Sequence, residues 1–230
     1  MSAQIFKVAR LSLALAAIFA IGAAQAVTLN KAFVAEPFLD TGLGGTTNAA
    51  RPELAGTVLE DDVVAFSFAG ISGTVQNRVV RETVSGTLDF YWRVKIDANS
   101  TGGSVSALRI GTFGYGWIND ADWRIDGLGS INAYTGRVFN PANPSNADGD
   151  INFLFTDPAI GAGGESTFMF LHTSATSYAR TALYDLTRDG GGGISGLQST
   201  FAPAIPEPST YGLMALGLGL LGAAARRRRG

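Results

Sequence analysis

The sequence has no cysteine and only one histidine among its 230 residues. Without cysteine, the chain forms no disulfide, no thiolate nucleophile and no cysteine-ligated zinc site. The single histidine, His172, excludes metal centres built from two or three imidazoles, and no G-x-S-x-G segment places a serine in a recognisable hydrolase context. We therefore expect His172 to be structural and the fold to depend on its hydrophobic core.

Positive charge is scarce once the two ends are set aside. The chain has 17 Lys and Arg against 19 Asp and Glu, but Lys7, Arg10 and residues 226–229 account for six of the 17. Residues 27–204 hold 11 basic and 18 acidic side chains, which gives a net charge of about −7. Nucleic acid is not an expected partner, because it requires a clustered basic face.

The amino end has the features of a secretory signal peptide. Lys7 and Arg10 precede apolar residues 11–24, and Ala24-Gln25-Ala26 forms a small-x-small cleavage site. The apolar run is shorter than the ~20 residues that a spanning helix needs. We expect signal peptidase to remove residues 1–26 and to leave Val27 as the first residue of the mature chain.

The carboxyl end reads IPEPSTYGLMALGLGLLGAAARRRRG. Its 15 apolar residues, 211–225, would form about 22 Å of helix and so would only just cross a hydrocarbon core of ~30 Å. Pro206 and Pro208 cannot continue this helix, which leaves Glu207 in an extended, accessible segment. Four basic residues follow the apolar run: Arg226, Arg227, Arg228 and Arg229. They would stay in the cytoplasm and place the rest of the chain outside.

The order Pro206-Glu207-Pro208-Ser209, short apolar helix and arginine cluster closely resembles the PEP-CTERM sorting signal of exported proteins in Gram-negative bacteria that make extracellular polysaccharide. The resemblance implies processing by an exosortase, an integral-membrane cysteine protease-transpeptidase, near the Pro-Glu-Pro. It also implies transient insertion in the inner membrane, followed by transfer to the cell surface or the extracellular matrix. Stretches such as GTLDFYWRV and WRIDGLG resemble the bodies of other PEP-CTERM proteins, but imply no particular activity.

Residues 27–204 show the alternating pattern of β-strands. In residues 88–97, Leu88, Phe90 and Trp92 share one face, while Asp89 and Lys95 lie on the other, which predicts a strand with one wet face. Further alternating runs occupy residues 63–68, 73–80, 105–113, 151–155, 167–173, 180–186 and 194–201. The similar segments ISGTV at 71–75 and VSGTL at 84–88 suggest two neighbouring strands, such as a hairpin.

Glycine-rich and asparagine-rich turns separate these runs, as in an antiparallel β-sandwich or jelly roll. The sequence therefore predicts an all-β fold with a helix at each end. We divide the chain into a signal peptide (1–26), a β-sandwich domain (27–204) and a PEP-CTERM sorting signal (205–230).

One segment, GYGWINDADWRIDGLG, combines aromatic and acidic residues. Tyr115, Trp117 and Trp123 lie near Asp120 and Asp122, and aromatic faces beside carboxylates are suited to binding sugar rings. Core aromatics beside a polar loop would explain the same residues. Both interpretations stay open.

A second segment resembles the start of a calcium loop. Asn146, Asp148 and Asp150 offer oxygen ligands at i, i+2 and i+4, but Ile151 stands where an EF-hand has glycine. A turn selected for its backbone explains these residues better. We expect no other cofactor.

The evidence for catalysis is weak. Two carboxylates for glycoside hydrolysis could be drawn from Asp120, Asp122, Asp126 and Glu165, but 18 acids supply such a pair by chance. We therefore expect a non-enzymatic, structural protein of the cell surface or matrix, associated with exopolysaccharide or biofilm. A carbohydrate-binding module that uses the aromatic loop is the alternative, and a surface glycoside hydrolase is a distant third.

Overall fold

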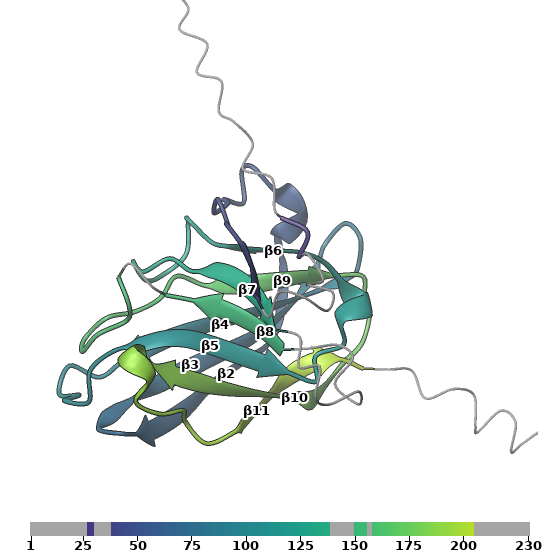
Figure 1. Ribbon diagram of the computed structural model, residues 1–230. Coiled ribbons are helices and arrows are strands. Elements are labelled where there is room, and N and C mark those ends of the chain that lie inside the picture. Colours follow the sequence, from purple (N-terminus) through teal and green to yellow (C-terminus); the bar gives the residue numbers. More distant parts are fainter. Residues whose placement is uncertain (1–26, 30–37, 139–149, 156–157, 205–230) are drawn as a thin grey trace, which may run out of the picture.

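The computed structural model describes residues 27–29, 38–138, 150–155 and 158–204. In these ranges the chain forms two antiparallel sheets (Figure 1). The six-stranded sheet has the order β1 (Phe38–Thr41), β7 (Tyr134–Val138), β8 (Asp150–Leu154), β5 (Val105–Gly111), β10 (Tyr178–Arg188) and β11 (Gln198–Pro203). The five-stranded sheet has the order β2 (Gly56–Phe68), β3 (Ile71–Glu82), β4 (Leu88–Ile96), β9 (Met169–Thr173) and β6 (Ile118–Trp123). Short 3-10 turns form η1 (Pro52–Leu54), η2 (Tyr115–Trp117) and η4 (Asp189–Gly191).

The all-β, antiparallel fold that the sequence predicted is confirmed for the described residues. The predicted hairpin is present, because β3 pairs with β4 from Gly73↔Ile96 to Arg81↔Leu88. ISGTV begins β3, but VSGTL lies mostly in the turn before β4, and only its Leu88 belongs to that strand. The jelly-roll arrangement stays a prediction. The two expected terminal helices lie outside the described residues, and within those residues no helix is long and apolar enough to cross a membrane.

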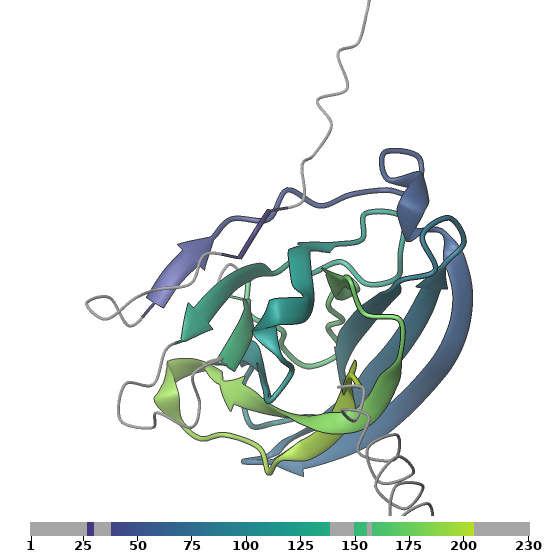
Figure 2. The same cartoon turned by 90° about the vertical axis from the view of Figure 1, so that its right-hand side faces the viewer.

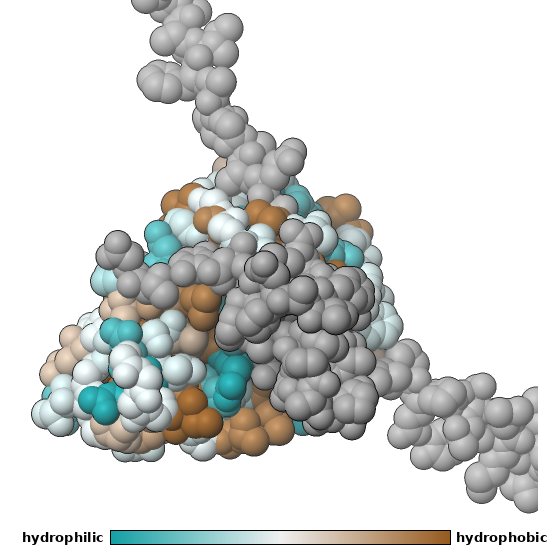
Figure 3. All heavy atoms as spheres, in the orientation of Figure 1, coloured by the Kyte–Doolittle hydropathy of each residue, from teal (hydrophilic) through white to brown (hydrophobic). Residues whose placement is uncertain are grey.

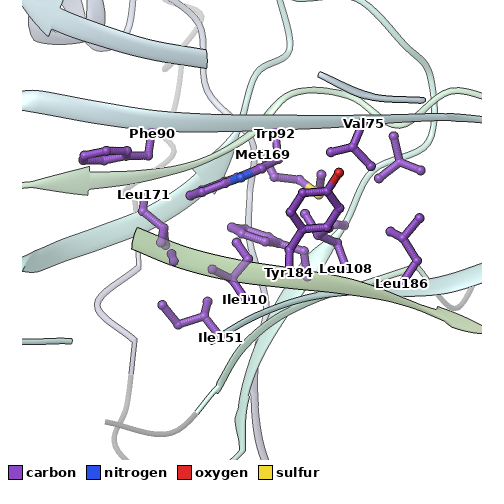
Figure 4. Packing of buried hydrophobic residues seen from close by; sticks show 14 of the residues in the cluster. Val75, Phe90, Trp92, Leu108, Ile110, Ile151, Met169, Leu171, Tyr184 and Leu186 are labelled. Carbon is purple, nitrogen blue, oxygen red and sulfur yellow. The ribbon is translucent and has the colours of Figure 1, made fainter. Parts of the chain in front are cut away.

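The main core lies between the two sheets, which face each other in Figure 2. Alternate residues of each strand point into this space, where side chains from both sheets meet, as Figure 4 shows for Trp92, Met169, Leu108 and Tyr184. The alternating pattern of residues 88–96 correctly predicted which side chains of this strand face the core. All five are buried: Leu88, Phe90, Trp92, Val94 and Ile96.

A polar link crosses the core between the sheets. Trp92 on β4 donates its indole N–H to Thr200 Oγ1 on β11 over 2.8 Å. Thr200 in turn donates to Asn77 Oδ1 on β3 over 2.9 Å. All three residues are buried, so these hydrogen bonds satisfy groups that would otherwise be costly in the interior.

The outer face of the five-stranded sheet is covered at one end. On β4, Lys95 is exposed and Arg93 half-buried, but Tyr91 is only 4 % exposed and Asp89 is 0 % exposed. The prediction of a fully wet face for this strand was therefore wrong at Asp89. The cover includes η1, whose Leu54 packs in a second hydrophobic cluster on this outer face. Its members are Leu54, Val80, Tyr91, Phe168 and Phe170.

The opposite side of the molecule carries mixed polarity. Figure 3 shows this side, where hydrophobic spheres near its lower edge lie in the region that β10 and β11 occupy in Figure 1. Leu183, Ile194 and Leu197 are exposed large hydrophobic residues in β10 and in the connection to β11. Scattered apolar residues of this kind are ordinary on a soluble surface, so we place no site there.

Candidate functional site

The covered end of the outer face brings together two acids and the single histidine. Strand pairing sets Asp89 of β4 beside His172 of β9, and His172 Nδ1 lies 2.9 Å from Asp89 Oδ1. Glu82, the last residue of β3, places its Oε1 2.9 Å from the same nitrogen. We call Glu82, Asp89 and His172 the acid–histidine cluster.

Neighbouring polar groups hold this cluster in place. The hydroxyls of Ser85 and Thr87, in the turn between β3 and β4, both donate to Glu82 Oε2. On the other side of His172, strand pairing places Asp120 of β6. The cluster is therefore built on three adjacent strands and one short turn rather than on a long loop, which favours a fixed geometry.

Burial and charge shift the titration of the cluster. Burial raises the pKa of Asp89 to about 6, although the hydrogen bond and charge of His172 oppose the rise. Burial lowers the pKa of His172, but the hydrogen bond and charge of Asp89, with Asp120 and Glu82, outweigh it and leave this pKa raised. Both shifts mean that the cluster retains protons more readily than the isolated side chains do.

Arg51 lies in the segment before β2 that covers this end of the sheet, and it binds Asp120, the neighbour of His172. Its Nη1 and Nη2 bind the two carboxylate oxygens of Asp120 at 3.0 and 3.3 Å, and its Nε donates to Glu53 over 2.8 Å. The guanidinium also lies 5.7 Å from the centre of the Phe170 ring. Burial opposes its charge, but the bonds to Asp120 and Glu53 raise its pKa. Arg51 therefore links strand β6 to the segment that precedes β2.

A cleft of about 480 Å³ opens beside the cluster, on the same outer face. Its apolar wall includes Leu54, Val58, Val80, Leu128 and Phe168. Its polar groups are mainly hydrogen-bond donors, on Tyr91, Arg78 and Arg124, with Asp126 as the acid among the described lining residues. We call this the Tyr91–Arg124 cleft.

Tyr91 lines this cleft, and its hydroxyl is buried. The residue is 4 % exposed, and its oxygen has no hydrogen-bond partner among the described residues. Burial raises its pKa and the charge of Asp89 adds to the rise, while the nearby guanidinium of Arg124 opposes it. Arg124 has no acceptor atom, so even a close approach leaves the phenol proton without an acceptor.

The two arginines are held by acids at the rim. Arg78 donates to Asp61 Oδ2 over 2.8 Å, yet its Nε is buried without a partner among the described residues. Its guanidinium lies 4.7 Å from the centre of the Phe168 ring. Arg124 Nε donates to Asp126 Oδ1 over 2.9 Å. The cleft thus combines fixed positive groups with an apolar wall.

The comparisons with known proteins concern the carboxyl end. Residues 204–229 match the family model of the PEP-CTERM protein-sorting motif. The chain carries a PEP-CTERM motif. This confirms the resemblance seen in the sequence, and a PEP-CTERM motif implies export, transient membrane sorting in a Gram-negative bacterium and processing by an exosortase. No curated protein and no solved structure matches the chain.

The residues assigned to PEP-CTERM sorting and to signal cleavage lie outside the described residues, except for Val27. Val27 forms a bridge with Ala121 of β6, and Leu29 is buried in the main core. The first residues after the expected signal peptide therefore already belong to the packed body.

The aromatic segment predicted as a binding loop is partly a strand. Trp117 ends η2 and Trp123 ends β6, so the two residues belong to different elements with the length of β6, at most about 20 Å of backbone, between them. Trp123 is covered by Gly45, where an added Cβ would lie only 2.4 Å from Trp123 Cζ2, on a backbone whose φ of +75° also suits glycine. The side chain of Tyr115 lies outside the described residues. The structure therefore places Trp117 and Trp123 at opposite ends of β6, and sugar binding by this segment stays a prediction.

The acidic residues of that segment have structural partners. Asp120 binds Arg51, and Asp122 Oδ1 accepts hydrogen bonds from the backbone N–H groups of Gly45 and Trp123. Of the calcium-loop residues, Asn146 and Asp148 lie outside the described residues, and Asp150 begins β8 opposite Val138. Nothing in the described residues tests the calcium hypothesis.

Two further acids had been considered as hydrolase carboxylates. Asp126 binds Arg124 and accepts the backbone N–H of Asn48, and its pKa is lowered by these bonds, which outweigh burial. Glu165 binds Lys95 over 2.8 Å, which lowers its pKa. Sequence reasoning missed both Glu82 and Asp89, although the alternation had placed Asp89 beside the aromatic Tyr91 on one face.

Proposed function

We propose that the processed protein is a non-enzymatic component of the cell surface or matrix that binds acidic exopolysaccharide through the Tyr91–Arg124 cleft. The observation that carries this proposal is the donor-rich lining of the cleft in an otherwise acidic body. Two arginines and one acid give the described lining a charge of about +1, whereas residues 27–204 together are at about −7. A carboxylate-bearing sugar unit would supply acceptors for the Tyr91 hydroxyl and for Arg78 Nε, which have no partner among the described residues, and would share the Arg124 guanidinium with Asp126.

The size of the cleft supports a saccharide ligand. A volume of about 480 Å³ lies within the range of small-ligand pockets and suits one or two sugar units. Arginine binds carboxylates through paired hydrogen bonds, and a buried tyrosine hydroxyl adds a directional donor. The apolar wall at Leu54 and Val80 would contact the carbon face of a ring.

A non-enzymatic role is supported by the acid that lines the cleft and not by every acid of this face, since the pKa of Asp89 is raised. A general acid needs a raised pKa and access to the substrate. Asp126 at the cleft and Glu165 beside it instead have lowered pKa values and bind arginine or lysine. Turnover of a glycan by the purified wild-type protein would overturn this part of the proposal.

Replacing Tyr91 with phenylalanine is expected to weaken binding to acidic polysaccharide about tenfold or more, since it removes one hydrogen bond to a charged group and keeps the packing. The measurement is retention of the processed protein on polygalacturonate and on the producer's own polysaccharide, with neutral dextran as reference. Tyr178→Phe is the matched control, because Tyr178 donates to Glu60 on another part of the surface.

Salt provides a second readout. Binding to the acidic polymers should fall as salt is raised, because arginine–carboxylate attraction is screened. Equal retention on dextran, or equal loss in Tyr91→Phe and Tyr178→Phe, would contradict the cleft assignment. No retention of the wild type on any acidic polymer would refute glycan binding itself.

A further inference from the structure

The acid–histidine cluster has the spacing of a metal site. One ligand atom each from Glu82, Asp89 and His172 lies within 4.8 Å of the other two. The nitrogen of His172 is 2.9 Å from an oxygen of each acid. Tetrahedral ligands of one zinc ion lie about 3.3–3.6 Å apart, since each sits about 2.0–2.2 Å from the ion, so these groups need to separate by only about half an ångström to hold it.

Hydrogen bonds from His172 alone do not satisfy both carboxylates of the cluster. His172 Nδ1 carries at most one proton, so it can donate to one of the two carboxylates but not to both. Glu82 Oε1 and Asp89 Oδ2 are buried and have no hydrogen-bond partner among the described residues. Glu82 is 3 % exposed and Asp89 0 %, so water does not solvate their charges. Buried unpaired carboxylate oxygens are costly and require a counter-charge.

Arg51 supplies only a small part of that counter-charge, because its charge acts on Asp89 less than the charges of His172 and Glu82 do. Its hydrogen bonds go to Asp120 and Glu53, which together carry more negative charge than one guanidinium neutralises. His172 is then the nearest cationic group to Glu82 and Asp89, and it offsets one negative charge only when protonated. A divalent cation would neutralise both acids and would leave His172 free to coordinate as a neutral imidazole.

We propose that Glu82, Asp89 and His172 bind one divalent transition-metal cation, with zinc as the best-fitting ion. One imidazole nitrogen and two carboxylate oxygens form a ligand set that zinc accepts, with a fourth position open to water. Calcium fits poorly, because it takes six to eight oxygen ligands. Ser85 and Thr87 bind the second oxygen of Glu82 and so orient its ligand oxygen toward the site.

The ion would join three strands at the covered end of the sheet. Glu82 ends β3, Asp89 lies near the start of β4, and His172 lies near the end of β9. Because the cluster adjoins Leu54 and Arg51, the metal would also stabilise the segment that covers the outer face. Its role is therefore structural, and it is independent of glycan binding in the cleft.

The test uses the processed protein, purified without a histidine tag, stripped with chelator and then titrated with zinc, manganese or calcium chloride. We expect one zinc per chain by elemental analysis after gel filtration. At a zinc concentration about 100-fold above the dissociation constant, we expect the melting temperature to rise by about 5–10 °C. Manganese should act more weakly and calcium should have little effect.

Two variants separate a metal site from a purely structural ion pair. In Glu82→Gln, zinc binding and the melting shift should be lost, while the metal-free variant should be as stable as the metal-free wild type or more stable, because one buried charge is gone. Glu165→Gln, which alters an acid on the same sheet that pairs with Lys95, should bind zinc as the wild type does.

Several results would overturn the proposal. These are no bound metal in the wild type, a melting shift with calcium but not zinc, or zinc binding that survives in Glu82→Gln and His172→Gln. A metal-free Glu82→Gln variant that is much less stable than the metal-free wild type, with no zinc effect on either, would identify the cluster as a structural ion pair.

Discussion

Replacing Pro206, Glu207 and Pro208 together with alanine is expected to abolish exosortase processing and to leave the unprocessed chain in the membrane fraction. These residues lie within the matched PEP-CTERM motif at 204–229. From the sequence we expect the two prolines to keep the segment before the apolar run out of a helix and the glutamate to be the accessible charged group there. Alanine favours helix, so the variant would extend the helix and remove the accessible segment.

Immunoblots of membrane and surface fractions measure this effect directly. Wild-type protein in an exosortase-deletion strain should behave like the triple variant, and Thr210→Ala, a neighbouring change in the same motif, should be processed normally. Changing the four arginines at 226–229 to glutamine should also impair sorting, because we expect these charges to keep the end of the apolar run in the cytoplasm. Normal processing of the triple-alanine variant would contradict the assignment.

The strands that the sequence predicted best are those with a continuous alternating pattern. Residues 88–96 form β4 within the predicted bounds, because one full face enters the core. The hairpin of β2 and β3 is longer than predicted, since strand pairing continues through residues such as Glu60, Asp61 and Asp62, where alternation is weak. Pairing to a long neighbour strand can thus override a poor local pattern.

β6 shows why part of the fold could not be read locally. The segment INDADW carries two acids and resembles a polar loop, yet it pairs with β9. Its acids are stabilised by Arg51 and by the backbone of Gly45, which lie about 70 or more residues earlier in the chain. Nothing near β6 in the sequence indicates these partners.

The acid–histidine cluster was hidden for a similar reason. Asp89 and His172 are 83 positions apart, and they meet only because β4 and β9 pair in that register. The alternation of β4 did contain one indication of the cluster, because Asp89 shares its face with Tyr91. A large aromatic side chain on a face predicted to be solvent-exposed indicates that another segment covers that face. The position of η1 over that face follows from tertiary packing alone.

Replacing Thr200 with valine is expected to lower the free energy of unfolding by about 2–5 kcal/mol. Valine has nearly the same shape, but it removes the hydroxyl that accepts from Trp92 and donates to Asn77. The indole N–H of Trp92 and the amide oxygen of Asn77 would then be buried without these bonds, and each orphaned group costs about 1–3 kcal/mol. For a domain of this size, the melting temperature should fall by about 5–15 °C.

Thr200→Ser is the matched control, because it keeps the hydroxyl and loses only one methyl group, at a cost of about 1 kcal/mol. Denaturant unfolding of the processed protein, followed by tryptophan fluorescence, compares the two variants. Asn77 lies close enough to the buried hydroxyl of Tyr184 to affect the pKa of that hydroxyl. In Thr200→Val, this hydroxyl can therefore donate to the amide oxygen of Asn77 that has lost Thr200. Thr200→Val should therefore be more damaging when combined with Tyr184→Phe than the sum of the single changes predicts. If Thr200→Val were as stable as Thr200→Ser, the polar link would add nothing to the packing of β4 against β11, and shape complementarity alone would hold the two sheets together.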